Sequence, residues 1–208
     1  MTNADWVRLW APAWAGIGAA GDGAGTRDGL LARYAEPQRA YHTTQHLAEC
    51  LELCDEFATA AERPAEVALA LWFHDAVYDV RASDNEARSA ALAVEALTAA
   101  GVAADAVRRV RDAVLATRHS GAPATADERL VVDVDLAILG APATRFAEYE
   151  AQIRREYAFV PESLFRAKRR EILRGFLARP SVYATAPFVA RFEAAARRNL
   201  AQAVGDGA

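Results

Sequence analysis

The amino-acid sequence predicts an all-α protein, built as a single-domain helical bundle over residues 1–208. Three observations predict this fold class. Apolar residues recur at spacings of three and four along most of the chain, helix start and stop signals bracket these segments, and no long segment alternates polar and apolar residues. The composition, 53% hydrophobic and 25% charged, is typical of a globular protein, and one domain is the default at this length.

Two helices are expected in about residues 1–40, with the glycine-rich segment Gly16–Gly29 as a flexible turn between them. The next helix begins near His46, because one of its faces is apolar up to Phe57. Pro64 opens the helix after that, at a position where a missing N–H costs nothing.

Capping boxes predict two further helix starts. Ser83–Glu86 precedes a helix that ends at Gly101, and Thr125–Glu128 leads into an apolar helix over Leu130–Leu139 that stops at Gly140. An amphipathic helix around Val107–Thr117 lies between them. The helices expected after residue 140 cover about 143–157, 161–177 and 187–201.

Composition excludes several classes of function. The formal net charge is −4, and a single lysine, Lys168, is present, so a broad surface for a nucleic-acid polymer or an anionic membrane is not expected. Cys50 and Cys54 lie four residues apart on an apolar face and are interpreted as reduced core residues. Without a signal-like segment or an apolar run of roughly 20 residues, a soluble cytoplasmic protein is expected.

The dipeptide His74-Asp75 ends the most apolar stretch of the chain, Val67–Phe73. A buried polar pair must be hydrogen-bonded, charge-paired or metal-bound. His46 lies at the margin of a buried helix face. The apolar helix over Leu130–Leu139 contains Asp133 and Asp135, which at about 100° per residue point roughly 160° apart. One of these two aspartates should therefore reach a site that the other does not.

Two imidazoles with two carboxylates form a mixed donor set suited to Mn²⁺, Fe²⁺, Co²⁺, Ni²⁺ or Zn²⁺, and Mg²⁺ stays open as well. Four protein ligands on an octahedral ion leave two positions for water or substrate, as a hydrolytic metal needs. No thiolate is expected in this set, which argues against a closed structural zinc site.

Four segments carry a family resemblance. The segments 39–46, 72–79, 84–90 and 133–140 resemble the H…HD…D signature and its surroundings in the HD superfamily of metal-dependent phosphohydrolases, in a bacterial branch of predicted hydrolases. The resemblance implies an HD-type helical fold, with a metal-binding core at about 41–140 and C-terminal helices at about 141–208. It implies one divalent ion, held by His46, His74, Asp75 and Asp135. Asp133 is the lesser candidate for the last position.

Six further residues are candidates for the chemistry around the ion. Asp79 and Glu86 could orient the attacking water, although a turn cap explains the first and a capping box the second. Arg39, Arg118 and His119 could bind a substrate phosphate, or could be two surface arginines and a helix cap. His42 is expected to face the substrate or to support a ligand, with direct ligation as a lesser alternative.

The function expected from these residues is hydrolysis of a small phosphate ester, with nucleotides among the candidates. A non-catalytic nucleotide-binding or sensing module on the same scaffold is the alternative. An HD-type oxygenase with two irons would need more ligands than the chain offers. The substrate, the native metal, the class of phosphate bond and a homodimeric state stay open.

Overall fold

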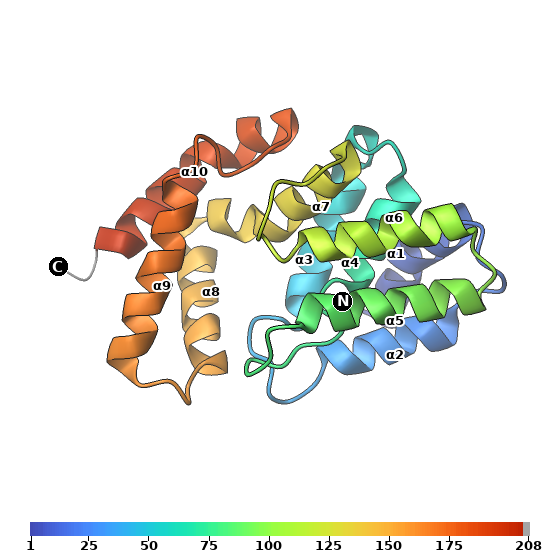
Figure 1. Ribbon diagram of the computed structural model, residues 1–208, viewed down its shortest axis with the longest axis horizontal. Coiled ribbons are helices and arrows are strands. Elements are labelled where there is room, and N and C mark those ends of the chain that lie inside the picture. Colours follow the sequence, from blue (N-terminus) through green and yellow to red (C-terminus); the bar gives the residue numbers. More distant parts are fainter. Residues whose placement is uncertain (206–208) are drawn as a thin grey trace. The chain divides into compact units, whose positions relative to one another are not determined.

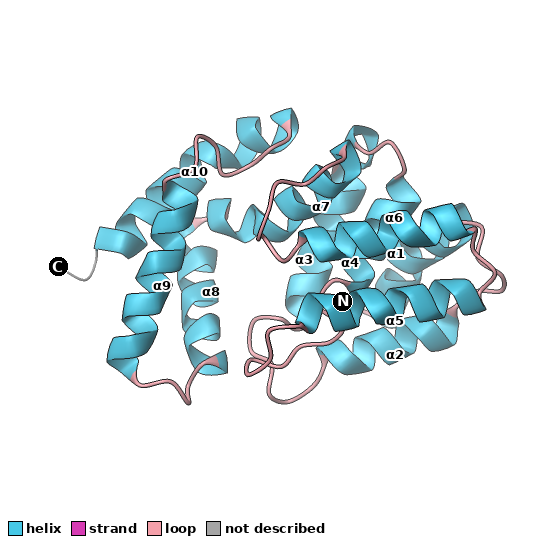
Figure 2. Cartoon of the chain, in the orientation of Figure 1, coloured by secondary structure: helices cyan, strands magenta, loops and turns pink. Residues whose placement is uncertain are grey.

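The computed structural model describes residues 1–205, and these residues form helices, turns and loops without a strand (Figure 2). The expected all-α class is therefore confirmed. The chain divides into two compact units, Met1–Asp135 and a second that begins at Leu136. The single-domain organisation stays a prediction. Within the described residues, no helix combines the length and the apolar character needed to cross a membrane.

The first unit contains seven α-helices and a short 3-10 helix at Ala58–Ala60. The α-helices are α1 (Asn3–Gly16), α2 (Ala24–Tyr34), α3 (Thr44–Glu56), α4 (Pro64–Phe73), α5 (Asn85–Ala99), α6 (Ala104–Ala116) and α7 (Ala126–Asp135). Helix α4 lies at the centre and packs against α1, α3, α5, α6 and α7 (Figure 1). Its central position follows from its sequence, because a helix that is apolar nearly all round must be buried on all sides.

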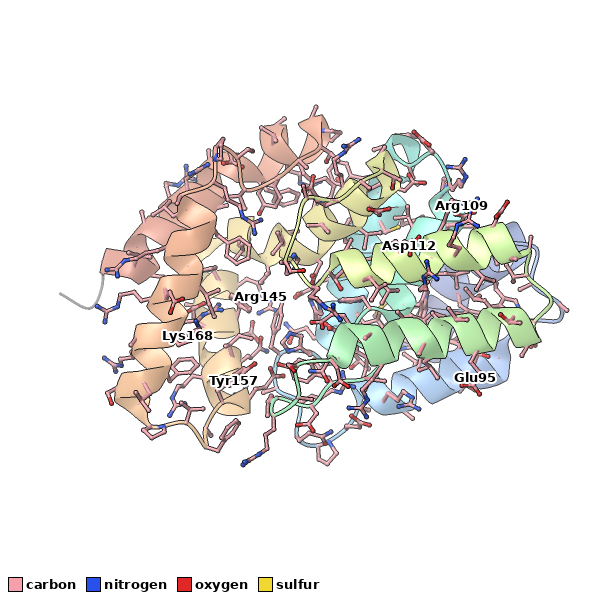
Figure 3. All side chains as sticks on the ribbon, viewed as in Figure 1. Glu95, Arg109, Asp112, Arg145, Tyr157 and Lys168 are labelled. Carbon is pink, nitrogen blue, oxygen red and sulfur yellow. The ribbon has the colours of Figure 1, made fainter. Side chains whose placement is uncertain are left out.

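Two kinds of contact fix α4 among its neighbours. The ring of Trp72 is fully buried and packs edge-to-face on Trp6 and Trp10, at centroid distances of 5.7 and 5.1 Å. On another side, the guanidinium of Arg109 on α6 donates two hydrogen bonds of 2.7 and 2.6 Å to Glu66 (Arg109 is labelled in Figure 3). These contacts hold the helix whose last turn leads into His74.

The turn in the glycine-rich segment near the N-terminus is shorter than the sequence predicts. Helix α2 already begins at Ala24, so Gly25 and Gly29 are helical. Gly23, at the start of α2, has a φ of +63°, and a Cβ there would meet the ring of Trp14 at 2.5 Å. Glycine lowers the intrinsic helix propensity of this segment, but the buried side chains of α2 stabilise the helix. The prediction of a turn considered only the glycines and was therefore wrong.

One of the two predicted capping boxes forms in part. The hydroxyl of Thr125 accepts the Glu128 N–H at 3.1 Å, while the Glu128 carboxylate accepts the N–H of Ala124. The prediction of a capping box at Ser83 is wrong. Helix α5 begins one residue later than predicted, after Asp84, and has no side-chain cap.

The side chain of Asn85 provides the reason for the later start of α5. It exchanges two hydrogen bonds with the backbone of Asp79, and so ties the start of the helix to the preceding loop.

The second unit contains η2 (Leu136–Gly140), α8 (Ala143–Glu156), α9 (Glu162–Leu177) and α10 (Ala186–Gly205). The helix expected over Leu130–Leu139 thus changes character at Asp135, where α7 ends and the 3-10 helix begins. Helix α10 packs against α9 and η2.

Gly140 makes a close contact with α10. A Cβ on Gly140 would lie 2.7 Å from the Cβ and 2.8 Å from the backbone oxygen of Phe192, and 2.9 Å from the hydroxyl of Tyr183. We expect Gly140→Ala to lower the free energy of unfolding by about 1–3 kcal/mol, because backbone must move. Gly175→Ala on α9 has no neighbour within 4 Å of its Cβ and should stabilise the helix by up to about 1 kcal/mol. Urea denaturation of both variants checks the difference, and equal midpoints would contradict it.

Candidate metal centre

The ends of three packed helices bring the predicted ligands together. His46 lies in the first turn of α3, His74 directly follows α4, and Asp135 is the last residue of α7. Helix α4 packs against both α3 and α7, so these side chains meet within the first unit.

The Nε2 atom of each imidazole lies at ligand-like distances from the other imidazole and from one oxygen of each carboxylate. The Nε2 atoms of His46 and His74 are 3.1 Å apart. The Oδ2 atom of Asp75 lies 3.0 Å from Nε2 of His74 and 3.5 Å from Nε2 of His46. The Oδ1 atom of Asp135 lies 3.3 Å from Nε2 of His46 and 3.6 Å from Nε2 of His74.

These distances fit one divalent ion. Metal–ligand bonds of about 2.1 Å place neighbouring ligand atoms about 3.0 Å apart in an octahedron and about 3.4 Å apart in a tetrahedron. Both imidazoles are almost fully buried, with 2% and 1% of the surface of His46 and His74 exposed. A buried cluster of His46, Cys50, His74 and Asp135, with one donor atom each within 4.8 Å of the others, could hold a metal ion.

The His74 ring is oriented by its other nitrogen. Its Nδ1 lies 2.7 Å from the carbonyl oxygen of Leu71, which can only accept, so Nδ1 carries the proton. The lone pair of Nε2 is then directed at the cluster, as in most metal-binding histidines. The backbone N–H of the next residue, Asp75, donates to the hydroxyl of Tyr34 at 3.2 Å.

Asp135 rather than Asp133 joins the cluster, as the resemblance implies. Asp133 is buried outside it. The second oxygen of Asp135, Oδ2, lies 3.0 Å from Nε2 of His119. His119 has a φ of +54° and is the only described residue other than glycine with a positive φ. A strained backbone at this position holds an imidazole against a ligand carboxylate, so we expect His119 to position Asp135.

This contact gives a prediction for His119. We expect His119→Ala to lower the affinity for a divalent ion by about 10–100-fold, because loss of an outer partner frees the carboxylate to rotate. His119→Gln, which keeps an N–H donor, should recover part of the loss. Calorimetric metal titration checks both variants. Equal affinities in the wild type and the alanine variant would contradict a positioning role.

The thiol of Cys50 was not expected at the site. Its Sγ lies 3.7 Å from both ring nitrogens of His46, one helical turn earlier in α3. The candidate cluster thus includes a sulfur atom, and a ligand set without a thiolate stays a prediction; Cys50 and Cys54 are both free and buried as predicted. The four-residue spacing from His46 to Cys50 was the available signal, because it places both side chains on one helix face.

Arg39 is buried, so the alternative of a surface arginine is wrong, while its role in binding phosphate stays a prediction. Its side chain is fully buried, and its Nη1 donates to the carbonyl oxygens of His42 and Asp75 at 3.1 and 2.6 Å. Nη2 donates to the carbonyl of Ala76, and Nε to the carboxylate of Glu36. Through these hydrogen bonds, Arg39 connects the loop before α3 to the turn at His74-Asp75.

The remaining candidates lie around this centre. The ring of His42 stacks on Tyr78 at 4.0 Å, with its centroid 5.9 Å from that of His46. The exposed carboxylate of Asp79 accepts the N–H of Arg81, which is the turn-capping alternative.

Glu86 and Arg118, the other two candidates, form a pair. The Nε of Arg118 lies 3.8 Å from a carboxylate oxygen of Glu86, and both side chains are partly exposed. The catalytic and substrate-binding roles of these residues stay predictions.

The charged neighbours shift the protonation of both imidazoles. Burial lowers the pKa of His46, but Cys50, Tyr41 and two carboxylates together raise it well above its ordinary value. Burial also lowers the pKa of His74, and Asp75 foremost raises it by more. In the metal-free site, the imidazoles therefore hold their protons to higher pH than free histidine.

The carboxylates shift in the opposite direction. Burial raises the pKa of Asp75, but the charges of His74 and His42 bring it well below its ordinary value. Burial likewise raises the pKa of Asp135, and the hydrogen bond from His119 is the largest of the effects that lower it below the ordinary value. Both carboxylates are ionised and ready to bind a cation at neutral pH.

These shifts predict opposite pH dependences without and with metal. Raised imidazole pKa values stabilise the metal-free fold below pH of about 6.5, and this contribution is lost as pH rises through the folded pKa values. Lowered carboxyl pKa values stabilise the fold above pH of about 4, and this contribution is lost as pH falls through the folded pKa values. Metal must displace the imidazole protons, so its stabilising effect should grow as pH rises. Thermal unfolding from pH 5.5 to 8.5 with and without Mn²⁺ checks this, and a metal effect that shrinks with pH would contradict it.

Comparisons with models of known protein families, with curated proteins and with solved structures found no match for this chain. The family resemblance therefore stays an expectation from the sequence motifs.

Proposed function

We propose that this protein is a metal-dependent phosphohydrolase of the HD type that acts on a small phosphate ester. One divalent ion would be held by His46, His74, Asp75 and Asp135. The observation that carries the proposal is that the two imidazole Nε2 atoms lie 3.1 Å apart and that each lies 3.0–3.6 Å from one oxygen of Asp75 and one oxygen of Asp135. A purely structural network of buried histidines and aspartates has no need of such an arrangement around one point.

In this proposal, the ligands and the residues that support them have different roles. When bound, a divalent ion acidifies a water molecule and polarises a phosphoryl oxygen. The carboxylates of Asp75 and Asp135 balance the charge of the cation, and the two imidazoles supply neutral donors. His119 keeps Asp135 in place through its 3.0 Å contact, and Arg39 fixes the backbone of Asp75.

Glu86 and Arg118 are the best candidates for contact with substrate. Arg118 lies just beyond the C-terminal end of α6 and directly precedes His119, which touches a ligand carboxylate. The side chain of Arg118 is 44% exposed, and its Nε lies 3.8 Å from a carboxylate oxygen of Glu86. A loose, partly exposed pair of this kind can exchange partners with an incoming phosphate, in contrast to the buried donors of Arg39. In this proposal, Arg118 binds the phosphate and Glu86 or Asp79 orients the water.

The proposal is tested with a panel of nucleotides, sugar phosphates and phosphodiesters, in the presence of Mn²⁺, Co²⁺ or Mg²⁺. We expect hydrolysis of at least one ester by the wild type, and loss of both bound metal and hydrolysis in Asp75→Ala. Asp105→Ala, an exposed position on α6, is the matched control and should keep both. Retention of full activity by Asp75→Ala would contradict the proposal. Thermal stabilisation by a nucleotide with no turnover of any ester would favour the binding-module alternative.

A further inference from the structure

We infer that Tyr34 is a positioning residue for both ligands of the His74-Asp75 pair, because its hydroxyl accepts a backbone N–H that would otherwise compete with the His74 ring for one carbonyl. The inference rests on the proposed metal site and concerns what orients two of its ligands. It starts from the hydrogen bonds at the end of α4.

Helix α4 ends with an exchange of hydrogen-bond partners. His74 still has helical dihedral angles, with φ of −55° and ψ of −41°. In a continuing helix, the N–H of Asp75 would donate to the carbonyl four residues earlier, that of Leu71. This carbonyl accepts the Nδ1–H of His74 at 2.7 Å instead, and the N–H of Asp75 donates to the Tyr34 hydroxyl at 3.2 Å. Tyr34 therefore replaces the acceptor that the His74 ring uses.

The hydroxyl of Tyr34 is unexpected for a residue that serves only the core. The side chain is fully buried on α2, where a phenylalanine would fill nearly the same volume without a polar atom. A buried hydroxyl costs free energy unless it is hydrogen-bonded, and its oxygen accepts the N–H of a proposed metal ligand. The centroid of the Tyr34 ring also lies 6.4 Å from that of His74. Tyr34 is thus next to both members of the pair.

Arg39 supports the other end of the same residue. Its Nη1 donates to the carbonyl of Asp75 at 2.6 Å, and its Cζ lies 5.3 Å from the centroid of the Tyr34 ring, within the range of a cation–π contact. Without the Tyr34 oxygen, the N–H of Asp75 needs another acceptor, and helix geometry offers the Leu71 carbonyl. The His74 ring would then share that carbonyl, and both ligands would lose their fixed orientation.

The experiment compares two variants of the full chain, Tyr34→Phe and Ser89→Ala, each of which removes one oxygen atom. The hydroxyl of Ser89 on α5 is also buried and accepts the N–H of Val77 at 3.0 Å, two residues beyond Asp75. A general loss of stability should therefore affect both variants alike. We expect the Zn²⁺ affinity of the folded chain to fall about 10–100-fold in Tyr34→Phe, and less than about 3-fold in Ser89→Ala.

Nuclear magnetic resonance of the Zn²⁺-loaded chain reports the orientation of the His74 ring. Its hydrogen-bonded Nδ1 proton should give a downfield signal in the wild type and in Ser89→Ala. In Tyr34→Phe, this signal should move upfield or broaden. If Tyr34→Phe does not fold, hydrogen exchange in the wild type replaces it. The N–H of Asp75 should then be protected, and exchange at the rate of an exposed loop amide would overturn the inference.

The outcomes separate this inference from the proposed function. Wild-type affinity in Tyr34→Phe, an equal loss in Ser89→Ala, or an unchanged His74 signal in Tyr34→Phe overturns the positioning role and leaves the hydrolase proposal standing. The expected differences in a chain that hydrolyses no ester support the positioning role and overturn the hydrolase. A wild-type chain that binds no divalent ion overturns both.

Discussion

Replacing His74 by alanine is expected to lower the affinity for a divalent ion by more than about 100-fold, and to remove metal-dependent hydrolysis with it. Its Nε2 lies within 3.6 Å of donor atoms from His46, Asp75 and Asp135, so it is close to every other donor of the proposed set. Loss of an outer partner already costs about 10–100-fold, and loss of a ligand must cost more. Equilibrium dialysis followed by elemental analysis measures the effect.

His42→Ala is the matched control for this variant. The His42 ring stacks on Tyr78 and does not belong to the donor cluster, so metal affinity should change by less than a few fold. An equal loss of affinity in both variants would show that His42 is also a ligand and that the donor set is assigned wrongly. Near-wild-type affinity in His74→Ala would exclude the site as described.

Replacing Arg39 by methionine is expected to lower the free energy of unfolding by about 3–5 kcal/mol, the cost of breaking a buried charged network by removing one partner. The change leaves the carbonyl oxygens of Asp75 and Ala76 without the donor that now reaches both. It also removes the support of the turn that carries Asp75. We therefore expect metal affinity to fall together with stability.

The control for Arg39→Met is Arg8→Met, which removes an exposed pair with Asp55 and should change stability by no more than about 0.5 kcal/mol. Chemical denaturation of metal-free and metal-loaded protein measures both variants. If Arg39→Met unfolds at the wild-type midpoint but loses affinity for a phosphate ester, Arg39 binds substrate and its role as a clamp is contradicted.

Much of the fold could be predicted because local signals agreed with burial. The apolar stretch Val67–Phe73 predicted a buried helix, and α4 is the helix on which five others pack. Predictions failed where tertiary contacts override local preference. Gly25 and Gly29 are helical because Leu30 and Tyr34 anchor α2 in the core, and no local property of glycine indicates this.

The donor residues of the site could be predicted from the sequence, but the contacts of the residues around them could not. His46, His74 and Asp135 could be picked out as polar residues in segments that must be buried, and the structure brings them together. The roles of Arg39 and His119 depend on which carbonyl and which carboxylate lie opposite them, 36 and 16 residues away in sequence. Cys50 was overlooked because an apolar face explains a cysteine equally well.

The central claim is that the first unit binds one divalent ion through His46, His74, Asp75 and Asp135. Its most direct test is the metal-to-protein ratio of the purified chain, measured by elemental analysis after saturation with Mn²⁺ or Zn²⁺ and removal of excess ion. One ion per chain in the wild type, and none in His74→Ala, is the result predicted here. A wild-type ratio near zero, or the same ratio in both proteins, would contradict the claim.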